Sequence, residues 1–105
     1  MSIDIISNYK EESESWIVEL SGELDVSCAD KLKSLVNDNI EEKFSNIVLD
    51  MKDLSYIDST GIGIIVGIMK RLREDGKDIS LLNTKDNVKK IFKITGLDQI
   101  INMEG

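Results

Sequence analysis

The stretch Asp58-Ser59-Thr60-Gly61-Ile62-Gly63 decides the fold, because two apolar segments of different character meet there. Before it, residues 46–51 form a short, nearly all-apolar run, which is typical of a strand covered on both faces. After it, a second apolar segment ends in Lys70-Arg71-Leu72-Arg73 and Gly76, the cations and the glycine that favour a helix C-terminus. The sequence therefore predicts a strand, a polar loop and a helix over residues 60–74.

Upstream of this junction, the chain alternates between strand and helix patterns. Residues 3–6 and 16–20 are rich in strand-forming side chains, and the polar residues 7–15 between them are predicted to turn a hairpin. Gly22-Glu23-Leu24-Asp25 then breaks the strand pattern. Residues 27–42 carry apolar side chains at helical spacing, which predicts an amphipathic helix with the first of them, a serine, as its cap.

Downstream of the junction, residues 78–83 are predicted to form a strand and Thr84 to open a further helix. Residues 96–101 form a closing element that the pattern leaves open between strand and helix. The order β-β-α-β-α-β-α predicts an α/β fold with a mixed sheet of four to five strands covered by helices. The length of 105 residues is that of one domain, so we expect residues 1–105 to form a single domain.

The composition excludes several classes of function. The chain has no histidine, so it has neither a Ser-His-Asp triad nor a His-ligated zinc. Its one cysteine, Cys28, allows no internal disulfide or redox pair, and we expect it to be a small, partly buried hydrophobe. The net charge of −7 argues against nucleic acid or an anionic membrane as a partner. We expect no catalytic residue, metal or cofactor of its own.

Targeting signals are not apparent in the sequence. Residues 1–4 lack the basic start and apolar stretch of a signal peptide. The longest apolar run covers residues 62–69 and includes two glycines, whereas a membrane span needs about 20 residues. A cytoplasmic location is therefore expected.

The hexapeptide at the junction is the first candidate for a functional site. Ser59 or Thr60 is predicted near the helix N-cap, where unsatisfied backbone N–H groups and the macrodipole favour an anion. Gly61 and Gly63 fall in the first helical turn, where each costs about 1 kcal/mol in helix propensity. That cost indicates either close backbone approach by a ligand or tight packing on the sheet. An ordinary Ser/Thr cap with packing glycines accounts for the local pattern equally well.

Two enzymatic interpretations of the acidic and hydroxyl residues fit this pattern less well. An aspartic-protease-like Asp-Ser-Gly is disfavoured because Thr60 stands where glycine is needed. An acidic cluster of Asp25, Asp50, Asp53 and Asp58 could bind magnesium in a small phosphotransfer domain that uses Asp50 or Asp58. Acidic residues at loop ends are more often solvated turns. Neither interpretation fits as well as one in which a hydroxyl is modified by another protein.

Phosphorylation of a serine at the helix start would act through local charge. It adds about −1.5 to −2 charges, which the helix N-terminus tolerates. Asp58 and Asp25 would repel the same charge. The pattern therefore predicts a change in surface field more than a change in fold, as in a docking switch.

Four segments together resemble the anti-sigma factor antagonists of the STAS domain family. Thr60 after the serine makes the resemblance slightly closer to the stress-response, sigma-B type branch. Ile62 stands where the family usually has leucine, which is a volume-conserving change. The segments are Gly22-Glu23-Leu24-Asp25, Val48-Leu49-Asp50-Met51, the run from Leu54 to Gly63, and Phe92-Lys93-Ile94-Thr95-Gly96-Leu97.

The resemblance implies a bacterial protein in a partner-switching circuit. In that family the unphosphorylated antagonist binds an anti-sigma factor that is also an ATP-dependent serine kinase, and a sigma factor is released. The kinase phosphorylates the serine, here Ser59, and a PP2C-type phosphatase restores it. By position, the implied partner-binding residues are Asp25, Asp58, Ser59, Thr60, Gly61, Ile62 and Gly63.

On this interpretation the chain is a monomer and not an enzyme. The alternative is a STAS scaffold or sensor-companion module without a sigma-factor target. We further expect Ile62, with Ile65 or Met69, to supply docking area, and Trp16 and Tyr56 to serve packing. Only one or two apolar residues of this helix should face the partner, and most should be core, namely most of Ile62, Ile64, Ile65, Val66, Ile68, Met69 and Leu72.

Overall fold

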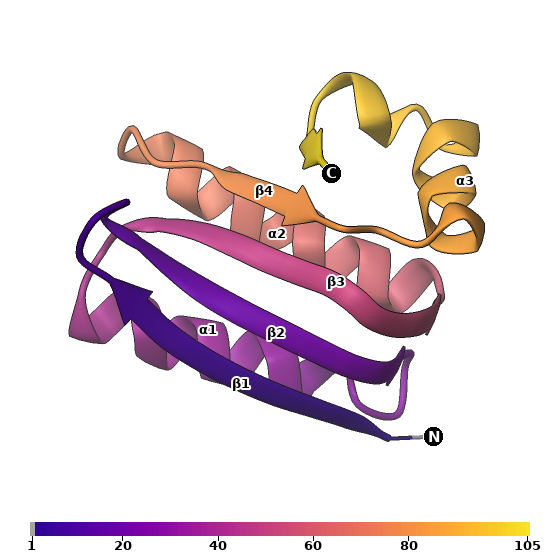
Figure 1. Cartoon of the computed structure of the whole chain (residues 1–105), viewed down its shortest axis with the longest axis horizontal. Helices are drawn as coiled ribbons and strands as arrows, with labels where there is room; N and C mark the ends of the chain where they lie inside the picture. Colours follow the sequence, from indigo (N-terminus) through magenta and orange to yellow (C-terminus); the bar gives the residue numbers. More distant parts are fainter. Residues whose placement is uncertain (1) are drawn as a thin grey trace.

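The chain folds into a five-stranded sheet with both long helices on one of its faces (Figure 1). The computed structural model describes residues 2–105. The strands follow one another across the sheet in chain order, with β1 antiparallel to β2 and all other neighbours parallel. The elements are β1 (Ile3–Lys10), β2 (Ser15–Leu24), α1 (Ala29–Glu42), β3 (Asn46–Ile57), α2 (Ser59–Glu74), β4 (Ile79–Leu82), α3 (Asp86–Ile94), the 3-10 helix η1 (Leu97–Gln99) and β5 (Asn102–Glu104).

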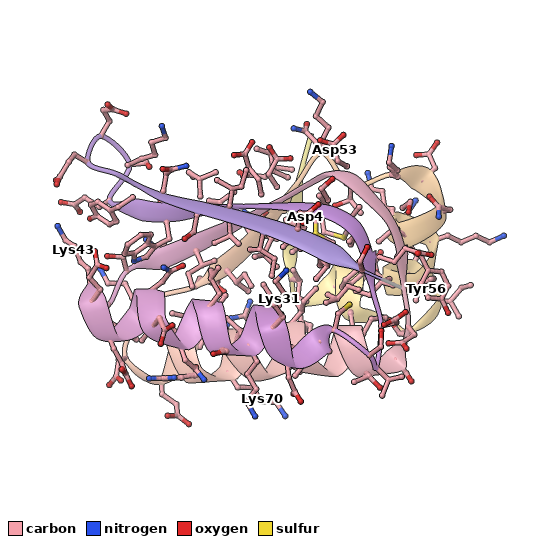
Figure 2. The ribbon with its side chains drawn as sticks, turned by 90° about the horizontal axis from the view of Figure 1, so that it is seen from below. Asp4, Lys31, Lys43, Asp53, Tyr56 and Lys70 are labelled. Carbon is pink, nitrogen blue, oxygen red and sulfur yellow. The ribbon has the colours of Figure 1, made fainter. Side chains whose placement is uncertain are left out.

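The mixed α/β sheet of four to five strands is confirmed, but the long helices do not cover both of its faces. In Figure 2, α1 and α2 both lie below the sheet, and Asp53 points away from them on the other side. The burial of β2 alternates accordingly, because Trp16, Val18 and Leu20 are buried while Glu19 and Ser21 are exposed. The prediction that residues 46–51 are covered on both faces is wrong, since every second residue there is only half-buried.

The first three strands are longer than the polarity of the sequence predicts. The hairpin turn occupies only residues 11–14, because residues 7–10 pair with β2. Residues 22–24 continue β2 rather than breaking it, although the pairing with β3 shifts register there. Gly22 has φ +111°, and a Cβ at this position would lie 2.5 Å from the Ser2 carbonyl oxygen. The predicted polar loop before residue 58 is instead the second half of β3, which pairs with this extension of β2.

Two predicted helix starts are also corrected. Cys28, not Ser27, occupies the N-cap of α1, and the Ser27 hydroxyl donates to the Asp25 carboxylate instead. Cys28 is half-buried, as predicted. The third helix begins at Asp86 rather than Thr84. The closing element is mixed, with a 3-10 turn followed by the short strand β5.

The buried side chains form one core between the sheet and the helices. Trp16 is buried as expected, and its indole Nε1 donates to the Lys43 carbonyl oxygen at 2.9 Å. Tyr9 packs edge-on against the Trp16 ring, with centroids 5.4 Å apart. None of the helices within residues 2–105 combines the length and apolar character that a membrane crossing needs.

The core contact of α3 yields a stability prediction. Phe92 is fully buried, whereas Ile94 on the same helix is 74% exposed. We expect Phe92→Ala to lower the free energy of unfolding by about 3–5 kcal/mol, because it removes contacts and leaves a cavity. Ile94→Ala should change it by no more than about 0.5 kcal/mol. Urea unfolding followed by circular dichroism measures both; equal midpoints for the two variants would contradict the packing of α3.

Candidate functional site

The candidate site lies where β3 passes into α2, beside the carboxyl end of β2. The two strands are in register at their ends, with Leu24 opposite Ile57. Ser59 is the first residue of α2, and both Ser59 and Thr60 are exposed. The predicted helix over residues 60–74 is therefore confirmed to within one residue. Loops at the carboxyl ends of parallel strands commonly form ligand sites, and this junction has that position.

Asp58 is the N-cap of α2, so Ser59 and Thr60 lie next to the N-cap as predicted, while the alternative of an ordinary Ser/Thr cap is wrong. The Asp58 Oδ1 accepts a hydrogen bond from the Gly61 backbone N–H at 2.9 Å. This is the usual geometry of a capping carboxylate, which satisfies an N–H of the first turn that has no partner inside the helix. Because the aspartate serves as the cap, the helix start does not depend on either neighbouring hydroxyl.

The same carboxylate joins the helix start to the neighbouring loop. Its Oδ2 accepts from the Val26 backbone N–H at 3.0 Å, and the Asp58 N–H donates to the Leu24 carbonyl oxygen at 3.1 Å. Two hydrogen bonds of Asp58 thus join the end of β2 and its following loop to the start of α2, and a third, from Gly61, caps the helix. Ser59 is consequently presented from a fixed position.

Asp25 shapes the loop that Val26 belongs to. The residue is buried, with 7% of its surface exposed, and its Oδ1 accepts from both the backbone N–H and the hydroxyl of Ser27. The hydrogen bond from the Ser27 hydroxyl is the main cause that lowers the pKa of Asp25 below its ordinary value. The carboxylate is therefore ionised near neutral pH, and it holds the turn between β2 and α1 in shape.

Two of the four predicted acidic residues meet at this site. Asp25 and Asp58 are joined through Val26, which follows the first and bonds the second. Asp50 and Asp53 lie back along β3, where a strand rises about 3.3 Å per residue, so Asp50 is roughly 20 Å or more from the junction. Within residues 2–105, no three His, Cys, Asp or Glu side chains are grouped so that they could hold a metal ion. The four carboxylates therefore do not form the magnesium cluster that was one interpretation of the sequence.

The two glycines of the first turn have different physical causes. Gly61 is buried, and a Cβ there would lie 2.7 Å from the Leu24 carbonyl oxygen and 2.9 Å from Ile57 Cγ1. A Cβ on Gly63 would meet no atom within 4 Å, and this residue is exposed. Tight packing explains the first glycine, whereas the second leaves the helix backbone open to approach.

The apolar side chains that face solvent at this site are not the predicted ones. Ile62, Ile65 and Met69 are all buried, so the expectation that these three supply docking area is wrong, while the expectation that most of the apolar residues of α2 form core is confirmed. Val26 is 73% exposed, and its backbone N–H donates to Asp58. Tyr56 is 43% exposed and precedes Asp58 by two residues. Figure 2 places Tyr56 at the end of the sheet where β3 passes into α2. A single apolar residue in a polar loop has no periodicity that could have predicted this.

The capping role of Asp58 leads to a second stability prediction. We expect Asp58→Ala to lower the free energy of unfolding by about 0.5–2 kcal/mol, because Gly61 N–H and Val26 N–H both lose their acceptor. Asp53→Ala is the matched control, since it removes an exposed carboxylate from β3 and should cost no more than about 0.5 kcal/mol. Chemical denaturation measures the difference, and an equal loss in the two variants would argue against the cap.

Comparisons with known proteins converge on one family. The family model described as "STAS domain" matches residues 7–105. An anti-sigma-B factor antagonist from Staphylococcus aureus is 31% identical over 86 residues, which cover 82% of this chain and 80% of that protein.

Solved structures agree with the sequence comparison. A putative anti-sigma factor antagonist from Thermotoga maritima is similar with a TM-score of 0.88 and 24% identity, covering 96% of this chain and 86% of that one. The anti-sigma factor antagonist SpoIIAA in its unphosphorylated form has a TM-score of 0.78 and 25% identity, covering 95% and 87%. The Bacillus cell fate determinant SpoIIAA in the phosphorylated form has a TM-score of 0.72 and 24% identity, covering 95% and 90%.

Proposed function

The chain belongs to the STAS domain family, and from this premise we propose that it is an anti-sigma factor antagonist switched off by phosphorylation of Ser59. In its unphosphorylated form it binds an anti-sigma factor and so releases a sigma factor. The anti-sigma factor is also the serine kinase, and a PP2C-type phosphatase reverses the modification. The circuit operates in the cytoplasm. Similarity to the Staphylococcus aureus antagonist and to SpoIIAA, whose phosphorylated and unphosphorylated forms are both known, supports this assignment.

The observation that carries the proposal is the exposed position of Ser59 on a rigid helix start. Asp58 provides the cap and Gly61 provides the close packing, so the serine is not needed for either. A kinase substrate needs a hydroxyl that can enter another protein's active site in a reproducible orientation. The hydrogen bonds of Asp58 to Gly61, Val26 and Leu24 provide that orientation.

In the proposed transfer, this chain contributes one nucleophile. Ser59 Oγ attacks the γ-phosphorus of ATP, the new O–P bond forms, and the bond to the β-phosphate oxygen breaks to release ADP. The hydroxyl proton passes to a base of the kinase, which also holds the nucleotide and its magnesium. No carboxylate of this chain is required as a base, which agrees with Asp25 and Asp58 being engaged in structural hydrogen bonds.

The switch is local and electrostatic. Phosphorylation adds about −1.5 to −2 charges, so a net charge of −7 becomes about −9. The new charge stands next to the Asp58 carboxylate and near Asp25, whose lowered pKa keeps it ionised. Backbone N–H groups at the helix start offset part of the repulsion, so the fold persists while the surface that met the kinase becomes more negative.

The proposed partner-binding residues divide into two groups by burial. Ser59, Thr60 and Gly63 are exposed and would touch the anti-sigma factor directly. Asp25, Gly61 and Ile62 are buried, and Asp58 is half-buried, so these four would act by positioning the exposed group.

The phosphorylation site can be tested with the cognate anti-sigma factor and ATP. We expect mass spectrometry to detect one phosphate on Ser59 in the chain without substitutions and in Thr60→Ala, and none in Ser59→Ala. Both alanine variants keep the Asp58 cap, so a loss of phosphate cannot be attributed to a lost helix start. Phosphorylation of Thr60 in the chain without substitutions, or of any residue in Ser59→Ala, would contradict the assignment.

The charge mechanism makes a separate prediction about binding. We expect Ser59→Asp to weaken the complex with the anti-sigma factor at least about tenfold, since a buried like charge at an interface costs several kcal/mol. Its thermal midpoint should stay close to that of the unmodified chain, because an acidic residue is favourable in the first turn of a helix. Ser34→Asp, on the exposed surface of α1, is the control. Isothermal titration calorimetry measures the affinities, and equal affinity for Ser59→Asp and Ser34→Asp would refute a switch based on charge.

A further inference from the structure

A groove that opens to solvent runs between the two long helices, on the surface that begins one turn beyond Ser59. Figure 2 shows α1 and α2 side by side below the sheet, with Lys70 of α2 pointing away from the sheet. The groove encloses about 290 Å³. Its lining includes Lys33 and Asn37 of α1 and Gly63, Ile64, Gly67 and Arg71 of α2.

The glycines in this groove are not required by the packing of the chain. Glycine lowers helix stability relative to alanine, so an interior helical glycine needs a physical cause. Gly61 has one, because a side chain there would collide with the end of β2. A Cβ on Gly63 or Gly67 would meet no atom within 4 Å, and both residues are exposed. Their missing side chains therefore leave room in the groove and relieve no clash inside the fold.

The charge of the groove is opposite to that of the whole chain. Lys33 and Arg71 are its charged lining residues, and both are cations in a chain with a net charge of −7. Arg71 Nη1 donates to the Asn37 side-chain oxygen, so the guanidinium of α2 is held towards α1. Cations kept at the wall of an apolar groove are complementary to carboxylates.

The groove continues the line of residues that begins at Ser59. Ser59, Gly63, Gly67 and Arg71 are spaced four apart, so they are successive neighbours along one side of α2. The distance along the helix from Gly63 to Arg71 is about 12 Å, or just over two turns. A protein that contacts Ser59 and extends along α2 reaches the groove without leaving this side of the helix.

We propose that the groove seats an acidic amphipathic helix of the anti-sigma factor. The backbone of that helix approaches over Gly63 and Gly67, its apolar side contacts Ile64, and its carboxylates pair with Lys33 and Arg71. This inference rests on the proposed function, and it adds a second contact region for the same partner. The first region senses the charge of Ser59, and the groove supplies contact area that phosphorylation does not alter directly.

Filling the groove is the direct test. Gly67→Leu places a side chain in the open space, and we expect it to weaken binding of the cognate anti-sigma factor about tenfold or more. Ser34→Leu adds the same side chain to the exposed surface of α1 outside the groove and should bind like the unmodified chain. Thermal unfolding of both variants checks that the fold is kept.

Reversing the groove charge is an independent test that does not depend on the tolerance of α2 for leucine. We expect Lys33→Glu/Arg71→Glu to weaken binding about tenfold or more, and, because the groove pairs become like-charged, added salt should reduce the deficit relative to the unsubstituted chain. Lys90→Glu/Lys93→Glu on α3 changes the net charge by the same amount and should leave the affinity within about threefold.

The outcomes separate the groove from the proposed function. Suppose that the anti-sigma factor binds the chain without substitutions and that Ser59→Asp weakens this binding. If both groove variants then bind as tightly as their controls, the groove inference is overturned and the switch stands. If the anti-sigma factor does not bind the unmodified chain, both are overturned. The inference is supported if both groove variants bind more weakly while their controls bind like the chain without substitutions.

Discussion

The geometry of the site depends on the two hydrogen bonds that the Asp58 carboxylate accepts. One oxygen caps α2 through the Gly61 N–H, and the other accepts from Val26 in the loop after β2. The carboxylate adds a side-chain connection to the backbone hydrogen bond by which Asp58 N–H already joins the start of α2 to Leu24 at the end of β2. The start of α2 and the loop between β2 and α1 thus form one surface, in which an exposed serine stands beside two carboxylates. The position of Ser59 is thereby set by hydrogen bonds in which its own side chain has no necessary part.

This arrangement separates structure from chemistry at neighbouring positions. Asp58 and Gly61 serve the fold, while Ser59 and Thr60 between them face solvent. A modification of the serine can therefore change the surface without removing a helix cap or a packing contact. The absence of histidine excludes catalysis that depends on an imidazole, and the proposed function requires none from this chain because the kinase supplies the base.

The sequence predicted α2 well and the strand ends poorly, for physical reasons that differ. The helix is marked by local signals, namely the cations and glycine at its exit, and these gave its bounds to within one residue. The second half of β3 contains the polar, exposed residues Lys52, Asp53 and Ser55, and their polarity made the segment resemble a loop. That segment is a strand because it pairs with residues 21–24 of β2, a contact between distant parts of the chain. The register shift at Gly22 is equally invisible in a local pattern.

The sequence indicated the junction as the candidate site, but it did not predict the division of roles within it. Aspartate, serine and threonine are all good helix caps, so three consecutive candidates cannot be ranked without the backbone geometry that selects Asp58. Gly61 and Gly63 likewise cannot be distinguished from the sequence, because they are two positions apart in the same helical turn. The end of β2 lies against only one of them, and so packing accounts for that one alone. A glycine in a helix that the fold does not require is evidence about the outside of the molecule, and in α2 two such glycines lie on the side that carries Ser59.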